Sequence, residues 1–348
     1  MEDIIEPDLA ICDAHHHLWD FPAQIPGFIS PYMMDALLKD IGSGHKVEST
    51  VFVECTAFYN ADSVGDLQFV GETEFANGVA AMSASNRYGA VRICEGIVGR
   101  ADFSTGAAVE NVLAAHVRAA ADRFRGIRHA AGWDASPEVG NSHSDPKKGL
   151  YADARFREGF AKLEDFNLSF DAWQYHPQLP ELIDLARAFP NISIVANHVG
   201  GLLGTGPYGN RESVFADWKG SIAQLAKCPN VVMKLGGLGM AMCGFGFHER
   251  SAPVTSEELA AAWRPYVETC IEAFGPARCM FESNFPVDKV SCSYTALWNA
   301  FKRISKGASA DEKALLFRDT ARRVYRLDSG QFQFSISRTA AYNPQVTR

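Results

Sequence analysis

Short apolar runs recur along the chain, and longer stretches whose apolar residues repeat with helical spacing separate them. Runs rich in Val, Ile, Phe and Cys are typical of strands that are buried on both faces. Strands that alternate with helices predict a parallel sheet joined by crossover helices. Eight such units favour a closed (β/α)8 barrel, or TIM barrel, over an open, doubly wound sheet. The expected strands are LAICDAH, STVFVECTAF, AVRICEGIV, FRGIRHAAG, LSFDAW, ISIVANH, VVMKLGG and RCMFESNF.

The expected helices lie between these strands, and one more follows the last strand. No linker rich in Pro, Gly or Ser divides the chain, so we expect a single α/β domain over residues 1–348. Its last part, residues 331–348, has the polar composition of a C-terminal tail. The expected helices are 33–41, 61–86, 106–123, 153–165, 180–188, 212–227, 256–274, 294–305 and 309–325.

Composition and charge limit the classes of function. A chain of 348 residues with 47% hydrophobic and 21% charged residues is typical of an ordinary soluble globular protein. A net charge of −8 without a long basic run argues against a nucleic-acid partner, and no apolar stretch of about 18 residues predicts a membrane span. The start MEDIIEPDLA does not resemble a signal peptide, and the eight cysteines form no CxxC pair, so we expect reduced thiols in a cytoplasmic protein. Composition leaves a monomer and a homo-oligomer equally open.

Three long loops follow expected strands, at the end of the barrel where enzymes of this fold build their sites. They cover residues 133–152, 199–211 and 238–255. The glycine runs GGLLGTG and GGLGMAMCGFG lie in or next to two of these loops, but neither matches a phosphate-binding motif. We therefore expect active-site loops there and no phosphate site.

Histidines gather at the ends of expected strands. In DAHHHLWD, alternation along the first strand places His15 and His17 on one face and His16 on the other. An H-x-H pair at a strand end can bind one metal ion. Further histidines follow the fourth, fifth and sixth strands, at His129, His176 and His198. Histidines from four strands at one rim favour a metal site or an acid–base site over simple packing.

Three motifs carry a family resemblance. DAHHHLWD, ANHVGG and FESNFPVD, on the first, sixth and eighth strands, resemble the amidohydrolase superfamily, and most closely its amidohydrolase-2 branch with fuconolactone-type and pyrone-dicarboxylate-type lactonases. The resemblance spans nearly the whole chain and implies a (β/α)8 barrel with His15, His17 and His198 as metal ligands. It implies one divalent metal at most, zinc or manganese. Because some relatives of this branch work without metal, a metal-independent site is the alternative.

The eighth strand departs from the family pattern. The resemblance implies an aspartate that contacts the metal and deprotonates water, and Asn284 stands in its place. An asparagine side chain cannot accept a proton at neutral pH. Alternation points Met280, Glu282 and Asn284 into the barrel and Phe281 and Ser283 outward. Glu282 is therefore the first candidate for the catalytic base.

Two other carboxylates are candidates for the same role. Asp288 lies in the loop beyond the eighth strand, and Glu54 ends the second strand on the face that alternation assigns to Phe52. Glu282 could instead be a structural partner of a buried cation. The sequence leaves both roles of Glu282 open.

Two cations on apolar strands and several aromatic residues point to a substrate pocket. Arg128 and Lys234 could bind a substrate carboxylate or, equally, pair with Asp13 or Glu282. Aromatic residues past strand ends could wall a pocket for a cyclic substrate or pack at the rim; they are Trp19, Phe58, Tyr59, Trp133, Trp173 and Tyr175. The residues expected to contact substrate are Arg128, His129, Trp19, His176 and Lys234, with Asn284 and His198 beside the base.

Together these features predict a hydrolase that opens a lactone or a related cyclic ester by water attack at the carbonyl. One alternative is a decarboxylase of the same branch that acts on an aromatic or unsaturated acid. Another is a barrel that binds a small ligand but has lost catalysis, which the asparagine at position 284 would explain.

Overall fold

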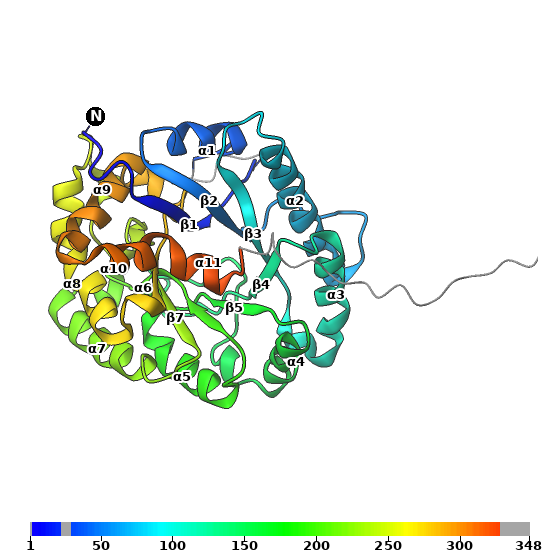
Figure 1. Cartoon of the computed structure of the whole chain (residues 1–348). Coiled ribbons are helices and arrows are strands. Elements are labelled where there is room, and N and C mark those ends of the chain that lie inside the picture. Colours follow the sequence, from blue (N-terminus) through cyan, green and yellow to red (C-terminus); the bar gives the residue numbers. More distant parts are fainter. Residues whose placement is uncertain (1, 22–28, 328–348) are drawn as a thin grey trace, which may run out of the picture.

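The computed structural model describes residues 2–21 and 29–327 of the chain. Eight strands form one sheet in the order β1 to β8, and each strand runs parallel to the next. The sheet closes on itself, because backbone N–H groups of Asn284 and His17 donate across the seam to the carbonyls of His15 and Phe285. Helices surround the sheet (Figure 1). The expected (β/α)8 barrel is confirmed.

All eight strands lie within or overlap the expected apolar runs. Strands β4 to β8 are short, three to five residues each, and every residue in them is buried. The bounds are β1 Ala10–His16, β2 Lys46–Val53, β3 Arg92–Arg100, β4 Phe124–Arg128, β5 Ser169–Ala172, β6 Ile194–Ala196, β7 Val231–Leu235 and β8 Cys279–Phe281.

The helices begin where polar side chains can accept hydrogen bonds from the first free N–H groups. Asp153 caps α4, Asn210 caps α7 and Ser293 caps α9, while Thr255 and Glu258 form a capping box at α8. The helices are α1 Met34–Ile41, α2 Val70–Ala84, α3 Glu110–Ala119, α4 Ala154–Asp165, α5 Leu179–Ala188, α6 His198–Gly201, α7 Arg211–Leu225, α8 Ser256–Phe274, α9 Tyr294–Ile304, α10 Ala310–Ala314 and α11 Thr320–Val324.

Three expected helices differ from the prediction. The helix expected at 106–123 starts only at α3, because Gly106 breaks the preceding 3-10 segment with φ of 65°. The helix expected at 61–86 begins as a 3-10 segment at Gly65 before α2. The helix expected at 309–325 is divided by a π-helical segment, Leu315–Asp319, between α10 and α11.

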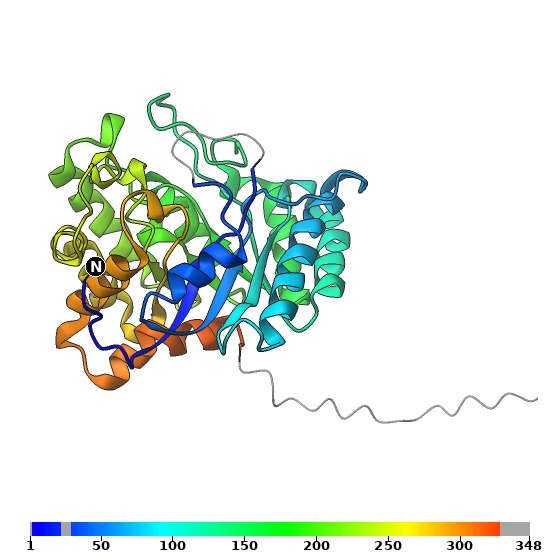
Figure 2. The same cartoon turned by 90° about the horizontal axis from the view of Figure 1, so that it is seen from above.

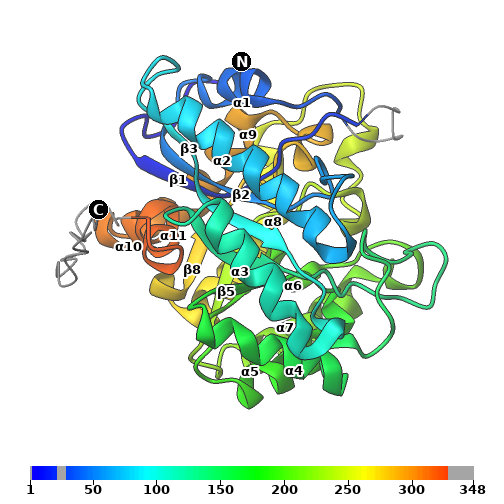
Figure 3. The same cartoon turned by 90° about the vertical axis from the view of Figure 1, so that its right-hand side faces the viewer.

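The C-terminal helices close the end of the barrel at which the strands begin (Figures 2 and 3). Val324, Tyr325 and Leu327 pack against apolar side chains of the lower lumen. These lumen residues are Cys12, Ala14, Val51, Val53, Val98, Val195, Val232 and Met280. The lower lumen is therefore an apolar core, and a binding site can form only at the opposite end.

Three further expectations concern the C-terminal tail, membrane-spanning helices and the cysteines. The polar tail at 331–348 lies outside the described residues. Within residues 2–21 and 29–327, no helix has the length and apolar character needed to cross a bilayer. The cysteines at all eight positions are free thiols.

Candidate active site

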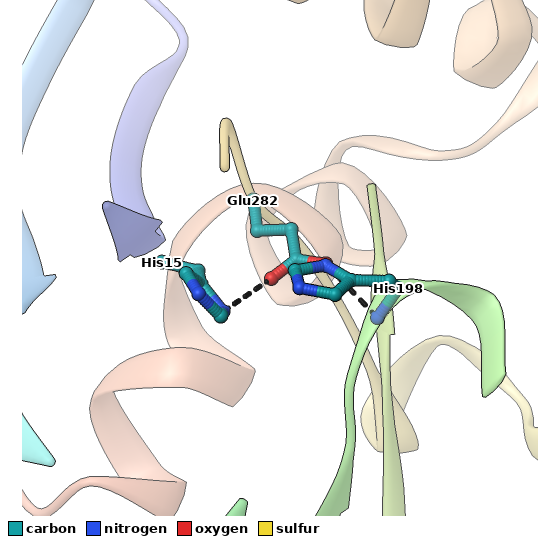
Figure 4. Close-up of side chains that lie close together, drawn as sticks. All are labelled: His15, His198 and Glu282. Carbon is teal, nitrogen blue, oxygen red and sulfur yellow. Dashed lines mark hydrogen bonds and ion pairs between the residues drawn. The ribbon is translucent and has the colours of Figure 1, made fainter. Parts of the chain in front are cut away.

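Three buried side chains from three strand ends converge at the upper end of the lumen (Figure 4). The Oε1 atom of Glu282 lies 2.7 Å from Nδ1 of His198. Its Oε2 atom lies 2.9 Å from Nδ1 of His15, without the alignment of a hydrogen bond. The donor atoms of the three residues all lie within 4.8 Å of one another. This cluster of His15, His198 and Glu282 is called the central cluster below.

His15, on β1, and His17, just past its end, reach the lumen because the strand changes face near its end. Cys12 and Ala14 point into the lower lumen, and a register irregularity then precedes His16. A bulge of this kind re-aims the residues that follow it. As a result, His15 and His17 also face inward, and their Nε2 atoms lie 3.2 Å apart.

His16 faces the other way, as strand alternation predicts. A hydrogen bond of 2.8 Å joins its Nε2 atom to Oγ1 of Thr50, and its ring packs edge-on against Phe52. Both partners belong to β2. The predicted orientation of the three consecutive histidines is confirmed.

Glycines make room for the central cluster. A Cβ atom on Gly236 would lie 2.4 Å from the Glu282 side chain, and one on Gly237 would lie 2.5 Å from the ring of His198. His198 itself has φ of 54°, and its backbone N–H donates to Oε1 of Glu282. A non-glycine residue in the left-handed region is strained, and such strain clusters at functional sites. The VVMKLGG run thus ends in two glycines because larger side chains would collide with the site.

His17 is oriented by its neighbours. Its Nδ1 atom donates to the carbonyl of Val53 at 2.8 Å, which leaves the Nε2 lone pair free, and its ring stacks on Trp19. The 3.2 Å between the Nε2 atoms of His15 and His17 is close to the spacing of about 3.3 Å between two nitrogens on one tetrahedral zinc ion. Trp19 was expected to contact substrate, and here it supports His17.

Two buried ion pairs flank His15. Nε of Arg128 donates to Oε1 of Glu54 at 2.7 Å, and Nη1 of Arg128 lies 3.3 Å from Nε2 of His15. Nζ of Lys234 donates to Oδ1 of Asp171 at 2.8 Å and lies 3.2 Å from Nδ1 of His15. Buried charges are tolerated when they are paired and hydrogen-bonded. Both cations are therefore largely neutralised before any substrate arrives.

These pairs correct the expected pairing of the two cations with Asp13 or Glu282. Asp13 instead accepts hydrogen bonds from the backbone N–H of Ser283 and from the hydroxyl of Tyr294. Glu282 contacts the histidines. The partners come from next-but-one positions in the strand order, because Glu54 follows β2 and pairs with Arg128 of β4, and Asp171 of β5 pairs with Lys234 of β7.

Burial sets the protonation of the flanking groups. Desolvation, with the nearby charges of Lys234 and Arg128, holds the pKa of His15 well below its usual range, and desolvation does the same for His17. Burial alone would raise the pKa of Glu54, but the charges of His143 and Arg128 hold it well below its usual range. His15 and His17 are thus neutral imidazoles with lone pairs, and Glu54 is an ionised carboxylate.

Asp288 and Asn284 belong to a separate hydrogen-bonded unit. Nδ2 of Asn284 donates to Oδ1 of Asp288 at 2.8 Å, and the backbone N–H of Gly239 donates to Oδ2 at 2.8 Å. Burial raises the pKa of Asp288 to about 8. Both oxygens of Asp288 therefore hold the loop after β7 against the end of β8, which weakens its case as the base.

Two expected substrate contacts have structural partners instead. Nδ1 of His129 accepts a hydrogen bond from the backbone N–H of Phe103, and the ring packs against aromatic side chains. Nδ1 of His176 accepts from the backbone N–H of Leu203, and its ring packs against Tyr208. A position just past a strand end does not fix which way a side chain faces, because alternation stops there. Trp173 does reach the site, where it packs edge-on against His198.

Three residues near the site were not among the expected ones. Asp171 follows the buried Phe170 on β5, so alternation could have placed it inward. Arg100 follows Val98 by two residues on β3 and lies opposite Arg128 in the β3–β4 register. His143 comes from the long loop after β4, where no periodicity places a side chain.

The central cluster has the donor chemistry of a metal site. Oε2 of Glu282 is buried and has no hydrogen-bond partner among the described residues, and two imidazoles lie beside it. Imidazole and carboxylate donors suit zinc or manganese. The cluster contains Glu282, which was expected as the base, in addition to the expected ligands His15 and His198, and His17 contacts it through His15.

Comparisons with known proteins identify the family of the chain. A family model described as Amidohydrolase matches residues 12–327. The uncharacterized protein y4mH of Sinorhizobium fredii is 35% identical over 340 residues, which cover 92% of this chain and 99% of that protein. An L-fucono-1,5-lactonase of Burkholderia multivorans is 28% identical over 184 residues, which cover 50% of this chain and 57% of the lactonase.

The fold is also that of solved relatives. An amidohydrolase from Burkholderia multivorans, crystallised with bound zinc, superposes with a TM-score of 0.69 at 23% identity and covers 91% of this chain and 99% of its own. The likeness at this identity shows the barrel fold alone. The family model, however, spans nearly the whole chain from β1 to α11. The chain therefore belongs to the amidohydrolase family.

Proposed function

We propose that the protein is a hydrolase that opens a lactone or a related cyclic ester by water attack at the carbonyl. The observation that carries the proposal is the buried Glu282 carboxylate, held between Nδ1 of His198 and Nδ1 of His15. A carboxylate held this way can take a proton from water that enters the cluster. The resemblance to a relative named L-fucono-1,5-lactonase supports the lactone as substrate class.

In this reaction Glu282 removes a proton from water while the water oxygen attacks the carbonyl carbon. The N–H groups of Arg128 and Lys234, on either side of His15, are oriented by their ion pairs and act as hydrogen-bond donors to the carbonyl oxygen as negative charge develops on it. The ring C–O bond then breaks, and the leaving oxygen takes up a proton. The product is a hydroxy acid.

His15, His198 and Glu282 would hold one divalent ion, with His17 next to them. A bound ion supplies Lewis acidity toward the carbonyl and makes water easier to deprotonate. The three possible ligands lie in one place and offer one ligand atom each, which suits a single ion. We therefore propose one ion per chain at most, with zinc preferred by the nitrogen donors. Elemental analysis of the purified protein tests this, and two metals per chain would contradict it.

Arg100 gives the site a cation for an anionic substrate. Its guanidinium group makes a 3.4 Å contact with the hydroxyl of Tyr59 and lies 4.9 Å from the ring centre of Phe69. In the described part of the chain, no carboxylate lies within ion-pair distance of it, although, against the lowering effect of burial, the charges of Glu54 and Asp102 are close enough to help raise its pKa. Because Glu54 and Asp171 neutralise the other two cations, Arg100 is the residue we assign to a substrate carboxylate.

A substrate screen tests the proposed function. The purified protein is incubated with lactones and, separately, with aromatic and unsaturated acids, and both acid release and CO2 release are measured. Acid release from a lactone, lost in Glu282→Gln, is the expected result. CO2 release would mark a decarboxylase instead, and binding without either product would mark a barrel that has lost catalysis.

A further inference from the structure

The loop after β4 brings a histidine to the charged rim of the site. Nε2 of His143 lies 2.9 Å from Oε1 of Glu54, and the same oxygen accepts the 2.7 Å hydrogen bond from Nε of Arg128. Nη1 of Arg128 in turn lies 3.3 Å from Nε2 of His15. His143 is thus linked to the central cluster through one carboxylate and one guanidinium group.

The loop itself is tied down on both sides of His143. The backbone N–H of Ser142 donates to the carbonyl of Gly132 at 2.8 Å, and the hydroxyl of Ser144 donates to the carbonyl of Ala130 at 2.5 Å. Both carbonyls belong to the segment just past β4. The loop therefore returns to the barrel mouth at His143, and the position of this side chain is set by backbone contacts as well as by Glu54.

His143 differs from the other groups of the site in its access to water. Its side chain is 31% exposed, whereas the Glu54 side chain is fully buried. Arg128 and Lys234 are almost fully buried as well. An imidazole in this place can exchange protons with solvent, and the buried Glu54 carboxylate fixes its orientation, which are two properties that a reusable proton donor needs.

Lactone opening needs such a donor. Water attack delivers a proton to Glu282, on the β8 side of His15, whereas the ring oxygen leaves as an alkoxide, which is a poor leaving group unless it is protonated. Arg128 and Lys234 are weak acids. A lactone whose carbonyl carbon lies beside Glu282 and whose ring oxygen points toward β2 and β4 turns that oxygen to the side of Arg128 on which His143 and Glu54 lie.

We propose that His143 is the general acid of the reaction and that Glu54 is its positioning partner. As the C–O bond of the ring breaks, the electron pair goes to the leaving oxygen and the imidazolium of His143 transfers its proton to it. His143 ends neutral and Glu282 ends protonated, and exchange with solvent restores both. This assignment rests on the proposed lactone hydrolysis.

Leaving-group dependence tests the assignment. His143→Gln keeps an amide that can donate to Glu54 but cannot transfer a proton. It is compared with wild type on an alkyl lactone, whose alkoxide needs protonation, and on an aryl lactone, whose phenolate leaves readily without it. We expect kcat to fall on the order of a hundredfold for the alkyl lactone and less than about fivefold for the aryl lactone.

The matched control is His248→Gln, because His248 is a half-exposed histidine in the loop after β7 with a carboxylate, Glu249, 3.7 Å away. It should leave both rates unchanged, and thermal unfolding checks that both variants fold. If His143→Gln lowered kcat equally on the two lactones, or lowered it on neither, the assignment would be overturned. A wild-type protein that opens neither lactone would instead contradict the proposed function, so the two failures are separable.

Discussion

The lower and upper halves of the barrel lumen are built by the same strands but hold opposite kinds of side chain. On three strands the change takes two residues: Val98 is followed inward by Arg100, Val232 by Lys234 and Met280 by Glu282. Below this level the lumen is apolar and sealed by the C-terminal helices. Above it the lumen holds charged side chains and histidines, and most of these side chains are paired with one another.

The difference separates what holds the fold together from what performs the chemistry. Burial of apolar surface in the lower half stabilises the fold by about 25 cal/mol for each Å² removed from water. The upper half buries charges, which cost free energy unless every one is compensated. Tyr325, in the sealing segment, joins the halves, because its hydroxyl donates to Oδ1 of Asp171 at 2.8 Å and Nζ of Lys234 lies 5.2 Å from its ring centre.

The largest effect on activity is expected at Glu282. Glu282→Gln keeps the shape of the side chain but removes the proton acceptor, so kcat should fall on the order of a hundredfold or more. Steady-state kinetics on an accepted lactone measure this, with circular dichroism as the check on folding. Asn284→Ala is the control, and it should cost less because Asn284 donates only to Asp288. A folded Glu282→Gln protein with a near-normal rate would shift the role of base to Asp288 or Glu54.

Met280→Ala, two residues lower on the same strand, should lower stability and leave activity nearly unchanged. It leaves a cavity in the apolar half, so the free energy of unfolding should fall by about 2–5 kcal/mol. The value of kcat should change by less than a few fold, since Met280 touches no charged group of the site in the described contacts. Urea unfolding and kinetics on the same samples measure both quantities. A large loss of kcat in a folded Met280→Ala protein would show that the two halves are not separable.

Arg100→Met tests which cation of the upper half is free for substrate. A hydrogen bond to a charged group contributes about 1.5–3 kcal/mol, so KM for a lactone that carries a carboxylate should rise about tenfold or more. The KM of a neutral lactone should stay nearly unchanged. Comparison of the two substrates is the measurement. If Arg128→Met gave this selective effect and Arg100→Met did not, the assignment would move to Arg128.

A smaller effect is expected in the pH dependence of stability, from a buried carboxyl group, Glu72, that has no ion-pair partner among the described residues. Glu72 on α2 accepts hydrogen bonds from the backbone N–H groups of Cys55 and Ala57, and burial raises its pKa to about 8 from an ordinary value of 4.5. The folded protein therefore holds a proton that the unfolded chain releases, so this contribution to stability is present below pH 4.5 and is lost as the pH rises toward 8.

Glu72→Gln should remove that loss. Between pH 5 and 8 the free energy of unfolding of the wild type should decline by up to about 1.4 kcal/mol per pH unit more steeply than that of the variant. Urea unfolding at three pH values measures the two slopes. Parallel slopes would show that Glu72 is already ionised in the fold.

Sequence patterns predicted the fold and the centre of the site for physical reasons that hold inside strands. Buried parallel strands are continuous apolar runs, and strict alternation placed His15 and His17 together and Glu282 inward. Beyond strand ends alternation no longer fixes which way a side chain faces. His129 and His176 have the expected positions in the chain but accept backbone hydrogen bonds away from the central cluster.

The features that the sequence did not predict depend on which residues are neighbours in space. Arg128 on β4 pairs with Glu54 just past β2, and Lys234 on β7 pairs with Asp171 on β5, so only the three-dimensional arrangement of non-adjacent strands identifies these partners. His143 lies in a loop whose path is set by hydrogen bonds to carbonyls past β4. No periodic pattern encodes such a path, so only the structure could reveal this residue.

Hydrolysis in 18O-labelled water tests most directly whether Glu282 and the histidines activate water for attack at a carbonyl. An accepted lactone is opened in labelled water by wild type, and the product is analysed by mass spectrometry. One 18O atom in the new carboxylate and none in the hydroxyl group, formed at a rate that Glu282→Gln lowers at least a hundredfold, is the predicted result. Label in the hydroxyl group, or an unlabelled product released with CO2, would contradict it.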